Sequence, residues 1–162
     1  MIMDERTEFA DNVSVAAVAG TALIGDVIDL GSTTSDIGNG ASVYLVIKTG
    51  ATEVITGGSA GTIRFLLASD AGASIATDGT ASVHFDTGTI VTGNAAANDA
   101  RLNAGGIIAM VELPIGNYER YVGILATIAT TTVTAGTIDA FLTRDASKWV
   151  ALPNAAGASI SI

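Results

Sequence analysis

The stretch Tyr118–Asp145, YERYVGILATIATTTVTAGTIDAFLTRD, decides the fold class of this protein. It consists mainly of Val, Ile, Leu, Thr, Ala and Gly, and Asp139 is the only charge between the charged groups that open and close it. β-branched residues at this density favour strands, and the stretch divides into two strands at residues 119–130 and 132–143. In the first strand, large apolar groups fall on both faces, which is typical of a sheet packed on one face and partly covered on the other.

The rest of the chain repeats this pattern at short spacing. Further β-branched runs, separated by turn signals such as Asn39-Gly40 and Asp78-Gly79, predict strands at residues 12–18, 23–30, 42–48, 62–69, 81–91 and 106–113. About eight strands without helical connections predict an all-β fold, an antiparallel two-sheet sandwich or barrel. The length suits one domain, so we expect residues 1–162 to fold as a single unit.

The composition excludes several classes of function. Seven Lys and Arg face sixteen Asp and Glu, and a net charge of −9 makes nucleic acid an unfavourable partner. Only 14% of residues are charged, which suggests that other protein covers part of the surface. No run approaches the ~18 apolar residues of a membrane helix, so no membrane partner is expected. The absence of cysteine excludes disulfides and thiolate chemistry, and the acidic start predicts synthesis in a cytoplasm without export.

One tripeptide resembles a catalytic motif. Asp86-Thr87-Gly88 follows apolar residues, as in the active-site loop of aspartic proteases, where two aspartates share one proton and activate water. A homodimer would need one copy per chain, and Tyr121–Gly123 loosely imitates the second signature of that family. However, the interval between the two motifs is short for a flap and its strands. Asp-Thr-Gly is also an ordinary strand-ending turn, so a dimeric protease using Asp86 is the last of the alternatives.

His84 is the only histidine in the chain. Ser82 and Asp86 could complete a triad on paper, but side chains at i and i+2 on a strand share a face without reaching one another's tips. We therefore expect a strand histidine with a local hydrogen bond. One histidine cannot build a zinc site, and residues 69–79 lack the spacing of a calcium loop. No catalytic residue, metal or cofactor is predicted, and the protein is not expected to be an enzyme.

The two chain ends supply the candidate contact residues. Phe9 and Trp149 fall outside the strongest predicted strands and are candidates for an interface, with the core as their alternative position. Apolar groups flank the charges of the first nine residues, which favours an arm that orders on contact over a disordered end. We expect arms at residues 1–11 and 153–162. The candidate interface residues are Met1, Ile2, Met3, Arg6, Phe9 and Trp149.

Considered end to end, the chain resembles the small capsid cement, or decoration, proteins of tailed phages of the Bordetella-phage type. The similarity is carried, in order, by MIMDERTEFADNVSVAAVAGT at the start, DVIDLG at 26–31, DIGNGASVYLVI at 36–47, ERYVGILATI at 119–128 and GTIDAFLTRD at 136–145. Residues 49–105 add little to it.

The resemblance implies a jelly-roll β-sandwich on the outer capsid surface of the virion. There it would bind the major capsid protein and clamp neighbouring capsomers against the pressure of packaged DNA. It also implies a homo-oligomer, with a dimer as the first expectation and a trimer as the alternative. A receptor- or glycan-binding decoration module on the same sandwich is a second hypothesis, because folds are reused for many functions. A cluster of exposed aromatic residues would support that hypothesis, and the sequence shows none.

Overall fold

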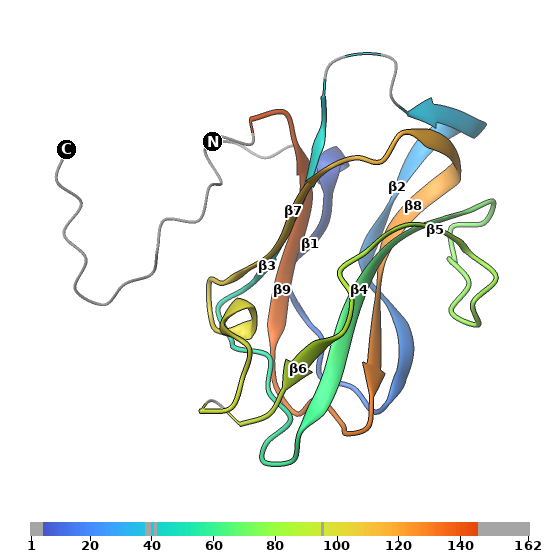
Figure 1. The fold of residues 1–162 in the computed structure, drawn as a ribbon. Helices are drawn as coiled ribbons and strands as arrows, with labels where there is room; N and C mark the ends of the chain where they lie inside the picture. The colour runs from blue at the N-terminus through green and yellow to red at the C-terminus, as the bar shows by residue number, and fades with distance from the viewer. Residues whose placement is uncertain (1–4, 38–39, 41, 95, 146–162) are drawn as a thin grey trace, which may run out of the picture.

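The computed structural model describes residues 5–37, 40, 42–94 and 96–145 (Figure 1). This part of the chain has two 3-10 helices and no α-helix, and therefore no helix long and apolar enough to cross a membrane. The 3-10 helices are η1 (Glu5–Thr7) and η2 (Ala100–Leu102). The strands are β1 (Glu8–Ser14), β2 (Gly20–Ile37), β3 (Tyr44–Thr49), β4 (Gly61–Asp70), β5 (Ser82–Asp86), β6 (Ile90–Thr92), β7 (Ile107–Glu112), β8 (Gly116–Ala129) and β9 (Thr137–Thr143).

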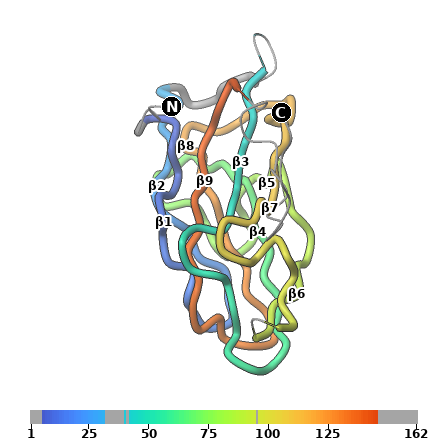
Figure 2. Tube along the Cα trace, turned by 90° about the vertical axis from the view of Figure 1, so that its left-hand side faces the viewer, coloured from blue at the N-terminus to red at the C-terminus, as the bar shows by residue number. Residues whose placement is uncertain are grey.

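The strands form two antiparallel sheets packed face to face (Figures 1 and 2). One has the order β1-β9-β3-β7, and the other has the order β2-β8-β4-β5 with β6 also paired to β4. Because β5 and β6 follow one another along the same side of β4, they act together as one broken strand. The result is the eight-position strand order of a jelly roll. The predicted antiparallel two-sheet sandwich is confirmed.

Several predicted strand boundaries are wrong. The first strand begins at Glu8 rather than residue 12, and residues 15–19 connect it to β2. The predicted strand at 81–91 breaks after Asp86, where the chain turns and Gly88 has a φ of +70°, outside the range of regular extended backbone. The strand predicted at 132–143 starts only at Thr137, because residues 130–136 first carry the chain from β8 in one sheet to β9 in the other.

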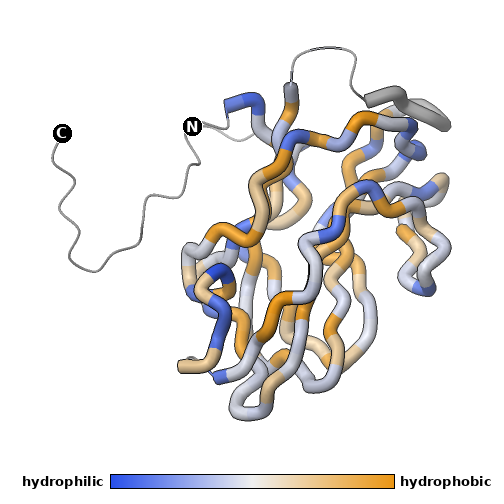
Figure 3. Tube along the Cα trace, in the orientation of Figure 1, coloured by the Kyte–Doolittle hydropathy of each residue, from blue (hydrophilic) through white to orange (hydrophobic). Residues whose placement is uncertain are grey.

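The core lies between the sheets and follows the two-residue alternation of the strands. β8 contributes Val122, Ile124, Ala126 and Ile128, each no more than 5% exposed. β4 contributes Ile63, Phe65 and Leu67 from the neighbouring strand. Burying each large apolar side chain of this kind stabilises a fold by about 1.5–3 kcal/mol. Figure 3 shows the hydrophobic colour along these strands, with hydrophilic segments mostly at turns.

The outer face of the β2-β8-β4 sheet is also apolar, as the sequence predicts for β8. Leu66, Ala68 and Leu125 form a second cluster there, and Ile75 covers them from the loop at residues 71–81. Asp70 holds this loop in place, since its carboxylate accepts hydrogen bonds from the backbone N–H groups of the loop residues 72 and 76. These hydrogen bonds lower the pKa of Asp70 below its ordinary value.

Candidate functional site

Asp86 ends β5 in a turn and is not arranged for catalysis. Its Oδ1 accepts a hydrogen bond from the backbone N–H of Gly88 at 2.8 Å, and its Oδ2 lies 3.2 Å from Nη1 of Arg64. Gly123, from the second part of the protease resemblance, lies on β8, and β4 separates it from β5. The structure therefore does not bring the two motifs together within the chain. Both oxygens of Asp86 serve the turn and its ion pair.

His84 forms a hydrogen bond, but the expectation of a local partner is wrong, because the partner lies on the neighbouring strand β4. Its Nε2 lies 2.7 Å from Oγ of Ser69 on β4. Its ring stacks on Tyr118 of β8, with ring centroids 3.6 Å apart and planes inclined by 13°. Ser82 bonds to a different group, the carboxylate of Glu119, at 2.7 Å. The cluster thus joins β4, β5 and β8 at one end of their sheet.

The hydroxyl of Ser69 connects His84 to β8. Ser69 is fully buried, and its Oγ accepts a hydrogen bond from the backbone N–H of Glu119 at 3.0 Å. The same Oγ forms the hydrogen bond with Nε2 of His84, in which the donor depends on the tautomer of the imidazole. Burial lowers the pKa of His84 below its ordinary value, and the negative charge of Glu119 partly opposes this shift.

A serine hydroxyl so close to an imidazole has the arrangement of an activated nucleophile. Here Ser69 is 0% exposed, so no substrate can reach its Oγ. The ring of Tyr118 closes the cluster from the core side, and its hydroxyl donates to the carbonyl of Pro114 at 2.8 Å. Burial raises the pKa of Tyr118 to about 12. The cluster is therefore a buried polar connection between strands.

The charges of the described surface are partly paired, and an acidic excess remains. Among the described residues, four basic side chains form ion pairs, each with a different acid. The pairs are Lys48–Asp139, Arg64–Asp86, Arg101–Asp99 and Arg120–Asp29. Within the described ranges no three His, Cys, Asp or Glu residues lie close enough to hold a metal ion.

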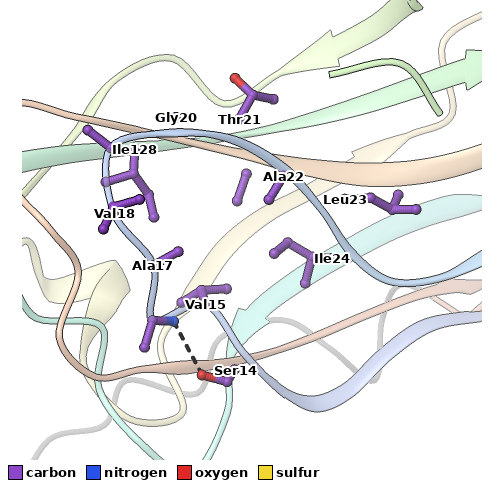
Figure 4. A pocket seen from close by; sticks show the side chains of 13 residues that line it. Ser14, Val15, Ala17, Val18, Gly20, Thr21, Ala22, Leu23, Ile24 and Ile128 are labelled. Carbon is purple, nitrogen blue, oxygen red and sulfur yellow. Dashed lines mark hydrogen bonds between the residues drawn. The ribbon is translucent and has the colours of Figure 1, made fainter. Parts of the chain in front are cut away.

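An apolar groove lies at the end of the sandwich where β1 passes into β2 (Figure 4). It has a volume of about 420 Å³ and is lined by residues 14–24 together with Ala126 and Ile128 of β8. Its lining carries no charge, and Val18 at its rim is 72% exposed. Small side chains in this connection, Ala16, Ala17 and Ala19, are the sequence signal that could have indicated the groove, although the first two fall in the strand predicted at 12–18.

The exposed large apolar side chains of the described residues are all aliphatic. They are Val18, Val83, Val91 and Ile115. Sugar-binding surfaces are expected to present aromatic rings, but the aromatic residues seen here are buried or half-buried. This surface therefore lends no support to the glycan-binding hypothesis.

The predicted contact residues divide into three groups. Arg6 is exposed on η1. Phe9 is 1% exposed and belongs to the core, so its ring does not face a partner and the alternative position holds for it. Residues 8–11 of the predicted arm form the first part of β1 because Phe9 and Ala10 pack inward. The remaining candidates, Met1, Ile2, Met3 and Trp149, lie outside the described residues, as does the predicted arm at 153–162.

These features define the class of the protein. It is a jelly-roll protein whose Ser69–His84 pair is closed to substrates because Ser69 is fully buried, so binding to other molecules falls to its outer surface. The family model of Bbp16, the capsid cement protein of a Bordetella phage, matches residues 12–142, and the chain belongs to the Bbp16 family. It is a structural protein of the phage capsid-associated type, and the resemblance stated above is confirmed. A comparison with curated proteins finds no match.

Proposed function

We propose that the chain is a capsid cement protein that binds the outer face of the phage head and clamps neighbouring capsomers against internal DNA pressure. The observation that carries this proposal is the family match, which runs from β1 to β9 and so covers both sheets. Its main partner is the major capsid protein, and its location is the outer capsid surface of the virion.

The fold suits a load-bearing role. Both faces of the β2-β8-β4 sheet are packed, one against the other sheet and one against the loop that carries Ile75. A stiff body can add contact area across a capsomer seam, where a stable interface buries about 1,600 Å². Engaging two capsomers at once multiplies weak contacts through effective concentration. Such a role does not require a catalytic site that is accessible to a substrate.

The N-terminal segment is the proposed point of attachment. Phe9 anchors β1 in the core, and the exposed Arg6 lies just before it. Met1, Ile2 and Met3 would then contact a neighbouring subunit or the shell from a fixed starting point. The structure places residues 8–11 in β1, so the attaching arm is limited to the residues before it.

Self-association is part of the proposal. We expect a homo-oligomer of single-domain subunits, with a dimer first and a trimer as the alternative. Its support is the low charged fraction of 14% and two exposed valines on the edge of the β2-β8-β4-β5 sheet, Val83 on β5 and Val91 on β6. Sedimentation equilibrium of the purified full chain measures the oligomeric state directly.

The attachment is tested by co-sedimentation with heads that lack the protein. The double variant Ile2→Ser with Met3→Ser should bind heads several-fold more weakly while melting at the wild-type temperature. The matched control is Ile115→Ser, which removes an aliphatic side chain that is 83% exposed at the turn between β7 and β8. Equal binding of the double variant and the wild type would show that the N-terminal segment does not attach the protein.

A further inference from the structure

The first part of β2 is an open edge of the second sheet, and the hydrogen bonds of Phe65 on β4 show which of its backbone groups point outward. The N–H of Phe65 donates to Oγ1 of Thr87, and its C=O accepts from the backbone N–H of Thr87, each at 3.0 Å. Both groups of Phe65 therefore point away from β8. In an antiparallel sheet the groups of the opposite residue, Ala126, then point toward β2, where Ala22 lies opposite.

Thr21 and Leu23, on either side of Ala22, therefore direct their N–H and C=O groups away from β8. β2 is the last strand in its sheet, and within the described ranges no group forms a hydrogen bond to these four. The close approach of Thr21 to Thr127, whose hydroxyl oxygens lie 3.0 Å apart, fits a pair that exchanges no backbone hydrogen bonds. This edge can accept a further strand.

The apolar groove described above lies along the same edge (Figure 4). Its lining includes the core side chains Val15, Ile24 and Ile128 and carries no charge. Its volume is about 420 Å³, and a Cβ on Gly20 would meet no atom within 4 Å. Because opposite residues of paired strands share a face, a strand added to this edge places one side chain beside Ala22, over the groove.

We infer that this edge and groove bind an extended, uncharged aliphatic segment of the capsid shell, which adds to the sheet as a strand beside β2. Main-chain hydrogen bonds to Thr21 and Leu23 supply affinity, and alternate side chains in the groove supply specificity. A charged segment would lose its hydration against a lining without charge. A second copy paired symmetrically about Ala22 would bring only another alanine and leave most of the volume empty, which favours the shell segment.

This inference rests on the proposed function and adds a second attachment point to it. The groove begins at Ser14, the last residue of β1, whereas the N-terminal attachment segment precedes Glu8, the first. At about 3.3 Å per residue, the two ends of β1 lie about 20 Å apart. Attachment points at opposite ends of one strand allow a single subunit to engage two capsomers at once.

Co-sedimentation of full-chain variants with heads that lack the protein tests the edge and the groove separately. Thr21→Pro removes an outward N–H that does not bond to β8, and its control Thr21→Val keeps that N–H, while both lose the hydroxyl contact with Thr127. Val18→Asp places a charge at the rim of the groove, and Ile115→Asp is its control at a similarly exposed site. We expect several-fold weaker binding by Thr21→Pro and Val18→Asp and wild-type binding by both controls.

The outcomes separate this inference from the proposed function. Wild-type binding by Thr21→Pro and Val18→Asp would overturn the inference alone, whereas a wild-type protein that does not bind heads would overturn both. Should Thr21→Pro fail to fold, hydrogen–deuterium exchange of the wild type decides the matter. The amides of Thr21 and Leu23 should exchange several-fold more slowly on heads than in the free protein, and equal exchange contradicts the inference. Slow exchange at high protein concentration without heads would make a second copy the occupant and would also overturn it.

Discussion

Gly25 of β2 lies directly against the backbone carbonyl of Phe9 of β1. Its φ is +67°, and a Cβ at this position would lie 2.0 Å from that oxygen. Only glycine allows both the conformation and the approach. The contact joins the two sheets at the edge where the N-terminal segment enters the fold, so it holds the proposed attachment point to the body of the sandwich.

Gly25→Ala should therefore lower the free energy of unfolding by about 3 kcal/mol or more, from backbone strain plus a steric clash. The matched control is Gly31→Ala, because Gly31 also has a positive φ, +73°, but has open space around its Cβ position. The control should cost only about 1 kcal/mol. Urea denaturation of both variants measures the difference, and equal losses would show that the contact with Phe9 is not tight.

The Ser69–His84 pair predicts a pH-dependent stability. Because the pKa of His84 is lowered in the folded state, the unfolded chain binds its proton more readily. Stability attributable to His84 is present above the ordinary pKa of 6.5 and is lost as the pH falls below it. Thermal melting between pH 8 and pH 5 should show a larger loss for the wild type than for His84→Gln. A difference between the two that stays constant across this range contradicts the arrangement.

Ile75→Ala should open the outer face of the β2-β8-β4 sheet. Ile75 is 3% exposed, and removing a buried isoleucine side chain costs about 2–5 kcal/mol, with the lower end expected where a loop can settle. The control Ile115→Ala, at an 83%-exposed site, should change stability by no more than about 0.5 kcal/mol. Limited proteolysis should also cut the variant faster within residues 71–81. A variant as stable and as resistant as wild type would mean that the loop does not cover the sheet.

Asp86→Asn should leave head binding unchanged. The amide oxygen can still accept from the Gly88 N–H, and only the half-exposed ion pair with Arg64 is lost. Such surface pairs contribute about 0–1 kcal/mol. Co-sedimentation with heads and a peptidase assay on the folded variant check this. Loss of a wild-type peptidase activity on substitution would restore the protease hypothesis.

The strand pattern of β8 and the turn at Asp86 are the features that sequence reasoning predicted best. Large apolar groups on both faces of β8 predicted a covered outer face, and Ile75 provides that cover. The Asp-Thr-Gly turn is local, since its hydrogen bonds join neighbouring residues, and local chemistry is visible in the sequence.

The cluster at His84 could not be predicted in the same way. Its partners come from β4 and β8, and the register of three strands brings them together. Nothing in the spacing of Ser69 from His84 signals that register. The start of β1 was missed for a similar reason, because Phe9 owes its burial to contacts with distant strands.

The central claim is that this protein clamps capsomers from outside the head. A cryo-electron microscopy map of heads assembled with the purified chain, compared with heads lacking it, tests this most directly. We expect added density shaped like the two-sheet sandwich on the outer surface, in contact with two neighbouring capsomers at each position. Heads that carry it should also retain DNA to a higher temperature. Density confined to a single capsomer, to the inner surface or to the tail would contradict the proposed function.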